Sequence, residues 1–259
     1  MALSSSFTLS PCTPADIDAV AAVYHASFAS DRANTFWWPR DPGAMLAWTI
    51  QRVRRKMRDP TVRHFKVVDG GELVAFARWD VPVGHEDMFG AWDGEGVGGG
   101  YDEEGKKEEE RGDGNRDRDR GIEVGEVGDA DPLVDDAAAS APVPYPEGAR
   151  PDLCRLFFDA LAGASKQWHE ETMLGLSLLC TSPKYHRRGA AKALLLPMLA
   201  LADARGLRVY LEATPGGKPV YEKLGFQVVD ELRFDLDKLT TDFEGEYKLS
   251  IMIREPKAI

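Results

Sequence analysis

A long glycine-rich and charged segment divides this chain and limits the folds that it can adopt. Residues 93–147 hold 18 acidic and 6 basic residues, and they change from glycine-rich to alanine- and proline-rich sequence. Such a stretch has too little apolar surface to offset the entropy lost on ordering, which predicts disorder. We place this insert at about residues 84–149. Each flanking sequence holds the elements of half a fold, so we expect a single domain over residues 1–259 that the insert interrupts.

The net charge of the chain reflects this insert more than the folded body. The whole chain carries −11, whereas residues 93–147 alone carry −12 and leave +1 for the remainder. A nearly neutral body without a basic stripe argues against a nucleic-acid partner. No run of about 18 apolar residues occurs, so we expect no membrane span. The first residues lack the basic and apolar regions of a secretory signal, and we expect none.

The cysteines indicate an intracellular protein. Cys12, Cys154 and Cys180 are widely spaced and form neither a metal-ligand pattern nor a disulfide framework. We therefore expect no metal site and a reducing compartment. The cytoplasm is the expected location, with the nucleus as the alternative.

Hydrophobic periodicity predicts strand, helix, helix, strand, strand before the insert and helix, strand, helix, strand, helix, strand, strand after it. The first helix should begin at Pro14, because Thr13 can cap it and proline suits the first turn. Asp69-Gly70-Gly71 reads as a hairpin turn. The expected strands are residues 7–11, 65–68, 73–79, 173–180, 207–213, 226–236 and 247–253. The other expected helices are residues 42–57, 151–170, 190–204 and 218–224.

One segment, PKYHRRGAAKALL at residues 183–195, has the composition of an anion site. An apolar strand precedes it, basic residues fill the loop, and small residues open the next helix. The first amides of a helix lack intrahelical acceptors and lie at the positive end of its dipole, so they attract phosphates. The phosphate motifs GxxxxGKS/T and GxGxxG are absent. The alternative is an ordinary basic loop whose small residues serve close packing.

A second segment, VYLEATPGGKPVYEKLGF at residues 209–226, holds two candidate catalytic residues. Glu212 ends a strand, and Tyr221 lies on the short helix that follows. A buried tyrosine near a reactive centre can donate a proton to a leaving group. By itself, a tyrosine such as Tyr221 is more often a core residue with a satisfied hydroxyl.

Together the two segments resemble the GNAT superfamily of acetyl-CoA-dependent N-acetyltransferases. They are most similar to small fungal-type members with a comparable LEAT…G…YEKLGF stretch. The resemblance is strong over residues 173–230, weaker over residues 7–83, and does not include the insert. It implies an α/β (α+β) fold: a mixed, mostly antiparallel sheet flanked by helices, whose two central strands splay to admit acetyl-CoA.

The resemblance also implies a set of coenzyme-binding residues. The family's Q/R-x-x-G-x-G/A motif aligns with residues 186–191, where His186 replaces the usual Gln or Arg. Backbone amides from Arg188 to Lys192 would hold the pyrophosphate, and a strand backbone would pair with the pantetheine arm. Lys184 and Arg187 would meet the adenosine-side phosphates or form a solvated surface pair. The implied residues are Leu178, Leu179, Cys180, His186, Arg187, Arg188, Gly189, Ala190, Ala191 and Lys192.

The implied reaction is direct attack of a small-molecule amine on the thioester. Tyr221 matches the tyrosine that protonates the coenzyme A thiolate in such enzymes. Because no acyl-enzyme forms, Cys180 needs only to pack. Glu212 is the best-placed candidate for the base or a substrate contact, with Asp80 or a relay of waters as alternatives. A further set of aromatic residues could line an acceptor pocket or pack in the core: Trp37, Trp38 and Trp79.

Two other classes of function remain open from the sequence. One is an acyl-CoA-binding sensor without catalysis, and the other is an interaction protein that recruits a basic partner through its acidic insert. The insert is otherwise a tolerated loop, since long loops cost little closure entropy, or a charge that gathers polyamines or basic peptides. We expect a monomer or a homodimer.

Overall fold

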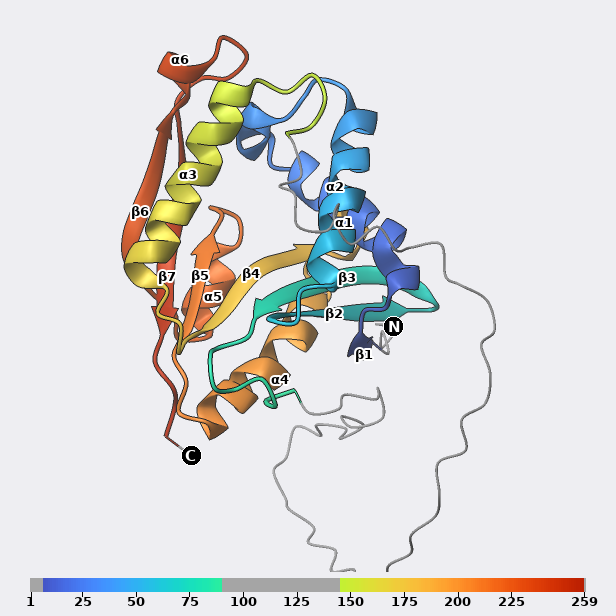
Figure 1. Cartoon of the computed structure of the whole chain (residues 1–259), viewed down its shortest axis with the longest axis vertical. Helices are drawn as coiled ribbons and strands as arrows, with labels where there is room; N and C mark the ends of the chain where they lie inside the picture. Colours follow the sequence, from blue (N-terminus) through green and yellow to red (C-terminus); the bar gives the residue numbers. More distant parts are fainter. Residues whose placement is uncertain (1–6, 90–144, 259) are drawn as a thin grey trace, which may run out of the picture. The chain divides into compact units, whose positions relative to one another are not determined.

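A single sheet of seven strands in the order β1-β2-β3-β4-β5-β7-β6 runs through the folded body (Figure 1). All neighbouring strands pair antiparallel except β4 and β5, which are parallel. The predicted mixed, mostly antiparallel sheet is therefore confirmed. The strands are β1 (Thr8–Pro11), β2 (Val62–Asp69), β3 (Glu72–Asp80), β4 (Leu174–Thr181), β5 (Val209–Ala213), β6 (Gln227–Asp235) and β7 (Glu246–Arg254).

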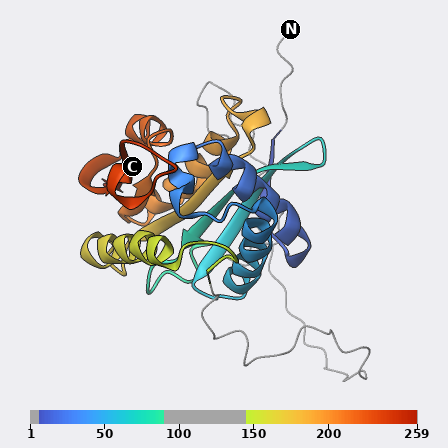
Figure 2. The same ribbon diagram turned by 90° about the horizontal axis from the view of Figure 1, so that it is seen from above.

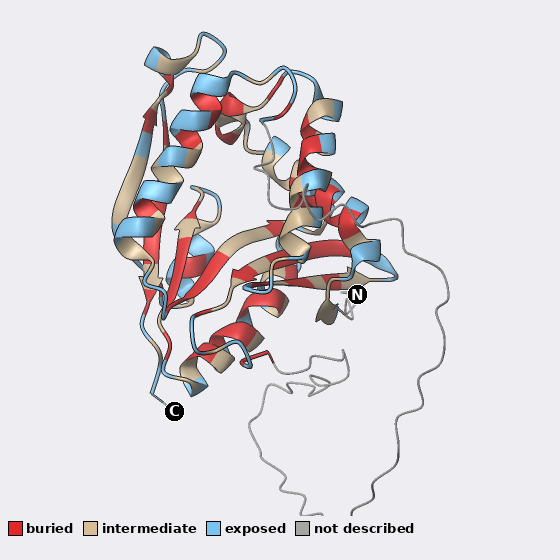
Figure 3. Ribbon diagram, viewed as in Figure 1, coloured by how far each residue is buried: buried red, intermediate tan, exposed pale blue. Residues whose placement is uncertain are grey.

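Helices cover both faces of this sheet (Figures 1 and 2). Helices α1, α2 and α3 pack on one face, and α4 and α5 pack on the other. Strands β3, β5 and β7 are buried along most of their length, whereas the edge strands β1 and β6 are mostly half-buried or exposed (Figure 3). The helices are α1 (Ile17–Ala29), α2 (Pro42–Met57), α3 (Pro151–Trp168), α4 (Ala190–Ala204), α5 (Lys218–Lys223) and α6 (Leu236–Leu239), with short 3-10 turns η1 (Pro14–Asp16), η2 (Arg32–Trp37) and η3 (Pro183–Tyr185).

This computed structural model describes residues 7–89 and 145–258. Most of the expected insert, residues 90–144, lies outside the described residues. Residues 84–89, which we had assigned to the insert, belong instead to the described body. Met88 and Phe89 are 3% and 5% exposed and join the core under α4, where the Phe89 ring lies 5.4 Å from that of Phe65.

Local sequence signals account for several element boundaries. The backbone amide of Thr13 donates to Asp16 Oδ2 at 2.7 Å, which forms the expected capping box before α1. Asp41 caps α2 by accepting from the amides of Gly43 and Ala44. Gly70 and Gly71 both have positive φ, as a tight hairpin between β2 and β3 requires.

The order of the predicted helices and strands is confirmed, and α2 and α4 have the predicted bounds. The turns η2 and η3 and the helix α6 were not predicted. Each has six residues or fewer, which is too short to produce a recognisable hydrophobic period.

Candidate active site

The sheet opens between its two parallel strands. Pairing of β4 with β5 is limited to Leu174–Val209, Gly175–Tyr210 and Leu176–Leu211. Beyond this point β4 continues to Thr181 paired only with β3, and β5 continues paired only with β7. The two strands point in different directions there (Figure 1). The expected splay of the central strands is therefore confirmed.

A β-bulge in β4 marks the start of this split. Arg78 of β3 pairs with Leu178 whereas Trp79 pairs with Leu176, so Ser177 is an extra residue in β4. A bulge bends its strand and increases the local twist. Leu178, Leu179 and Cys180 follow on the part of β4 whose edge toward β5 is unpaired. This backbone edge can accept an extended ligand as an additional strand.

The N-terminus of α4 lies after the free part of β4. Gly189 has φ +94° and occupies the N-cap position, and no side chain caps the helix. The amide of Ala193 makes the first intrahelical bond, to Gly189 O at 2.9 Å. The amides of residues 190–192 therefore have no acceptor within the helix. Arg187 also has positive φ, at +60°, so the loop turns sharply just before the helix.

Basic side chains surround these amides. Lys184, Arg187, Arg188 and Lys192 are exposed, and none of them forms an ion pair with a described carboxylate. The guanidinium carbon of Arg188 lies 5.1 Å from the ring centroid of Tyr185. Free cations beside open helix amides form an environment that favours an anion.

His186, the residue that departs from the family motif, contacts the strand rather than the open amides. Its Nε2 lies 3.1 Å from the carbonyl oxygen of Thr181 at the end of β4. As a donor, this nitrogen ties the loop to the strand and so orients the amides that follow. The imidazole therefore has a structural contact of its own, and its assignment to the coenzyme remains a prediction.

Tyr221 lies in the core on the α4 side of the sheet, with its ring 5.7 Å from that of Phe226. Gly217 faces the Tyr221 ring closely, because a Cβ on Gly217 would lie 3.1 Å from Tyr221 Cε2. Burial raises the pKa of the Tyr221 phenol, which keeps it protonated near neutral pH. A protonated phenol is the form that a general acid requires.

The thiol of Cys180 is fully buried on the free part of β4. Burial raises the pKa of this thiol far above its ordinary value, although nearby Arg78 opposes the effect. The thiolate is the nucleophilic form of cysteine, so Cys180 lacks the environment of a reactive residue.

Glu212 lies on the opposite face of the sheet from Tyr221, at the split. Its Oε1 accepts a 2.8 Å hydrogen bond from the hydroxyl of Tyr210. Burial raises the pKa of the Glu212 carboxyl and the charge of Asp80 adds to this, while the Tyr210 bond and Arg78 oppose it. A carboxylate with a raised pKa is a better proton acceptor at neutral pH. Glu212 and Asp80, both named from the sequence, thus lie in one cluster.

Four further residues of this cluster were not identified from the sequence. Arg78 Nε donates to Ser177 Oγ at 2.8 Å, and the Ser177 hydroxyl lies 3.2 Å from Asp80 Oδ1. The His169 ring stacks on Tyr210 with 4.7 Å between centroids. The sequence did contain a signal for this cluster. Arg78 and Asp80 are the two charged residues of the otherwise apolar strand LVAFARWD, and their alternate positions put them on the same face of the sheet.

The three tryptophans considered for an acceptor pocket lie mainly in the core. Trp37 and Trp79 are fully buried, and Trp37 stacks on Phe157 at 5.2 Å. Trp38 is half-buried and packs near Tyr24. These positions match the core-packing alternative.

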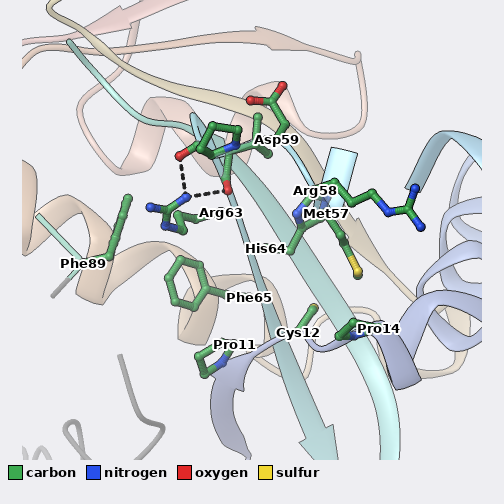
Figure 4. A pocket seen from close by; sticks show the side chains of 12 residues that line it. Pro11, Cys12, Pro14, Met57, Arg58, Asp59, Arg63, His64, Phe65 and Phe89 are labelled. Carbon is green, nitrogen blue, oxygen red and sulfur yellow. Dashed lines mark hydrogen bonds between the residues drawn. The ribbon is translucent and has the colours of Figure 1, made fainter. Parts of the chain in front are cut away.

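A cavity of about 390 Å³ lies away from the split, between the end of α2 and strands β1 and β2 (Figure 4). Arg63 at its wall donates to the carbonyls of Pro60 and Val62. Burial raises the pKa of the Cys12 thiol there to about 12, so it stays protonated. With Arg63 bonded to backbone carbonyls and the Cys12 thiol protonated, neither of these two residues is in a reactive arrangement.

The described residues have neither membrane-spanning helices nor groups suited to a metal ion. None of the helices has both the length and the apolar character needed to cross a bilayer. No cluster of three or more potential metal ligands occurs in the same part of the chain.

Both a family model and solved structures match this chain. Residues 157–239 match the family model described as an acetyltransferase (GNAT) domain. No curated protein matches the chain. Among solved structures, histone acetyltransferase HPA2 and related acetyltransferase from Corynebacterium glutamicum has a TM-score of 0.51 at 18% identity, covering 98% of both chains.

Two other solved structures are more distant. The ribosomal-protein-S18-alanine N-acetyltransferase from Escherichia coli has a TM-score of 0.47 at 14% identity, covering 98% of this chain and 96% of that one. The PaiA N-acetyltransferase from Thermoplasma acidophilum, solved in complex with coenzyme A, has a TM-score of 0.46 at 11% identity, covering 96% and 99%. Residues 157–239 thus match the GNAT acetyltransferase domain, and the chain shares its fold with the C. glutamicum protein.

Proposed function

We propose that the protein is an N-acetyltransferase that moves an acetyl group from acetyl-CoA to a primary amine. The observation that carries this proposal is the opening between β4 and β5, which leads from a free strand edge to the open amides of α4. A thioester substrate with a pantetheine arm and a pyrophosphate has the two chemical features that this arrangement suits.

The residues proposed to bind acetyl-CoA form three groups according to the part of the coenzyme that they contact. The backbone of Leu178, Leu179 and Cys180 offers hydrogen bonds to the pantetheine amides. The amides of residues 188–192 offer donors to the pyrophosphate, with the side chains of Lys184 and Arg187 toward the other phosphates. The amides of residues 190–192 have no acceptor within the helix, and the side chains of Lys184 and Arg187 are exposed, which supports this assignment.

The proposed chemistry is direct acyl transfer. Glu212, or a water next to it, takes a proton from the ammonium of the acceptor. The amine nitrogen then attacks the carbonyl carbon of the thioester and loses its second proton to water as the amide forms, and the carbon–sulfur bond breaks. Tyr221 donates its phenolic proton to the leaving thiolate. The raised pKa of the Glu212 carboxyl supports its role as a base, and the buried phenol of Tyr221 is protonated near neutral pH.

The first test is a thermal shift with acetyl-CoA, followed by coenzyme A release with a panel of amines. We expect stabilisation by acetyl-CoA and release of thiol that depends on the amine. Tyr221→Phe should lower kcat by about 100-fold or more, whereas Tyr145→Phe, at an exposed tyrosine, should have no effect.

The outcomes separate the parts of the proposal. No shift with millimolar acetyl-CoA would contradict coenzyme binding. Binding without turnover on any amine would indicate a sensor instead of an enzyme. Unchanged kcat in Tyr221→Phe would remove the general acid from the mechanism while leaving the transfer intact.

A further inference from the structure

Two arginines lie on the α1–α3 face of the sheet without a carboxylate partner. Arg52 comes from α2 and Arg78 from β3, and both are half-buried. Neither forms an ion pair with a described residue, although ten other arginine and lysine side chains of the body do. A buried cation without a partner is costly, so such groups call for an explanation.

Arg78 is held in place by only one of its nitrogen atoms. Its Nε donates to the hydroxyl of Ser177 at 2.8 Å, and Ser177 sits in the bulge where β4 leaves β5. The two terminal nitrogens of Arg78 have no acceptor among the described residues. Because a guanidinium donates in a planar fork, an Arg fixed at Nε presents its outer edge for a bidentate ligand.

Arg52 is held by aromatic stacking. Its guanidinium carbon lies 4.9 Å from the ring centroid of Trp48 and 5.0 Å from that of Phe158. Stacking uses the face of the guanidinium and leaves its N–H groups at the rim available for an acceptor. Arg52 is therefore oriented without being neutralised.

The surrounding titratable groups do not balance these two charges. Burial lowers the pKa of Arg52 to about 10, and the nearby Arg78 acts in the same direction. Asp80 partly offsets Arg78. Tyr24, Cys180 and Glu212 on the same face all have raised pKa values, and His64, across from Arg78 on β2, has a pKa lowered by burial to about 4. Near neutral pH the tyrosine, the thiol and the imidazole are thus uncharged.

We propose that Arg52 and Arg78 bind the carboxylate of the acceptor, which makes the acceptor an amino acid or a similar amine with a carboxylate. This inference rests on the proposed acetyl transfer. Arg78 and Glu212 lie on strands separated only by β4 and share one face of the sheet, and the pKa of Arg78, which burial lowers, is raised in turn by the charge of Glu212. A compact molecule can then place its carboxylate at the arginines and its amino group at Glu212.

The same charges disfavour another class of acceptor. A polyamine would bring two or more positive charges to a face that holds Arg52 and Arg78, with the carboxylates of Asp80 and Glu212 as the counter-charges of Arg78. Like charges at short distance repel strongly in a partly buried site. The structure therefore favours a carboxylate-bearing amine over the polyamines that the acidic insert suggested.

The experiment compares acceptors that differ only in the carboxylate. Full-length protein with saturating acetyl-CoA is assayed for coenzyme A release with glycine, alanine, phenylalanine, lysine and glutamate. Each is compared with its α-amide and its decarboxylated amine. We expect kcat/KM to be at least about tenfold higher for the best amino acid than for its amide and amine, the effect of a charge-assisted hydrogen bond.

Variants then identify the residues. Arg78→Gln and Arg52→Gln should each raise KM for the amino acid by about 10- to 100-fold while leaving the decarboxylated amine unaffected. The matched control is Arg54→Gln, an exposed arginine on the same helix, which should change neither. If a glutamine variant fails to fold, Arg78→Lys keeps the charge and should give a smaller rise in KM.

The assay results distinguish a wrong carboxylate site from a wrong assignment of N-acetyltransferase activity. Equal turnover of amino acids, amides and amines would overturn the carboxylate site and leave the N-acetyltransferase standing. If no amine reacts, thermal shifts with the amino acids and their N-acetyl derivatives test the arginines directly. A shift in the wild type that Arg78→Gln abolishes would support the site, and no shift in either protein would overturn it.

Discussion

The hydroxyl of Tyr210 donates a 2.8 Å hydrogen bond to Oε1 of Glu212, two residues further along β5. Both side chains therefore lie on the same face of the sheet, next to the split. Burial raises the pKa of Glu212, and this hydrogen bond moderates the increase because it stabilises the carboxylate. The pair thus sets the pH at which Glu212 can accept a proton.

Removing the Tyr210 hydroxyl should shift the activity to higher pH. A general base acts only when deprotonated, so kcat/KM rises as the pH passes through the pKa of Glu212. Tyr210→Phe deletes a bond that lowers this pKa and should move the acidic limb upward by about one pH unit. The measurement is kcat/KM against pH for both proteins. A shift in the opposite direction would contradict the assignment of that limb to Glu212.

Replacing Glu212 itself should remove the acidic limb of the pH profile of kcat/KM. Glu212→Gln keeps the size of the side chain and its contact with Tyr210 but cannot accept the proton. We expect kcat to fall by about 100-fold or more, with little pH dependence left on the acidic side. Glu222→Gln, at an exposed position of α5, is the matched control. A normal rate in Glu212→Gln would leave water as the proton acceptor.

Gly175 should not tolerate a side chain. A Cβ there would lie 2.6 Å from Cε1 of His169 and 3.2 Å from Cβ of Asp80, so His169 would have to leave its stack on Tyr210. We expect Gly175→Ala to lower the free energy of unfolding by about 1–3 kcal/mol, measured by urea denaturation.

Gly163 in α3 offers the contrasting control for Gly175. Nothing lies within 4 Å of a Cβ at this position, and glycine is a poor helix former. Gly163→Ala should therefore raise the free energy of unfolding by about 0.5–1 kcal/mol. Equal effects of the two substitutions would contradict the packing argument.

A buried ion pair joins α4 to the last strand. Arg254, 2% exposed, donates from Nη1 and Nη2 to the two oxygens of Asp203 at 2.7 Å each. The hydrogen bonds from Arg254 lower the pKa of Asp203 below its ordinary value. The stability from this pair is therefore complete above the ordinary pKa of an aspartate and is lost as the pH falls through the lowered value.

Asp203→Asn should consequently cost about 3–5 kcal/mol at pH 7, because Arg254 would remain buried and unpaired. The measurement is the free energy of unfolding against pH. The difference between the variant and the wild type should shrink in acid, where Asp203 is protonated in both states. A constant difference across pH would show that the loss comes from packing and not from charge.

Most of the acidic insert should be dispensable for catalysis. We expect a protein with residues 94–142 replaced by a short Gly-Ser linker to fold and to release coenzyme A at the rate of the full chain, since loop length has a small effect on closure entropy. The deletion keeps Phe89, which packs in the core, and Tyr145. Thermal unfolding and the amine assay measure the two properties. Loss of transfer in a folded deletion protein would assign the insert a part in the reaction.

The parts of the fold that depend on local sequence could be predicted, and those that depend on distant pairing could not. Periodicity placed α2 and α4 correctly, whereas β5 begins at Val209 instead of residue 207. The reason is that the amide of Leu207 bonds to Ala202 at the end of α4. Tyr221 and the loop before α4 stand out because each lies within one short motif.

The arginine cluster was missed because its members come from separate elements. Arg52 lies on α2, Arg78 on β3 and Ser177 on β4, up to 125 positions apart in the chain. The bulge at Ser177 arises from the register between β3 and β4, which no single segment specifies. Hydrophobic patterning reveals which face of a strand is buried but not which polar residue meets it there.

The split also makes the sheet two blocks, β1 to β4 and β5 to β7, that share only three residue pairs along their common border. A ligand lying in this border supplies backbone bonds that the chain itself leaves unmade, and it would act as a removable eighth strand. Because such a ligand binds only the folded chain, its free concentration adds directly to stability. Occupation of this border would therefore hold the two blocks of the sheet together.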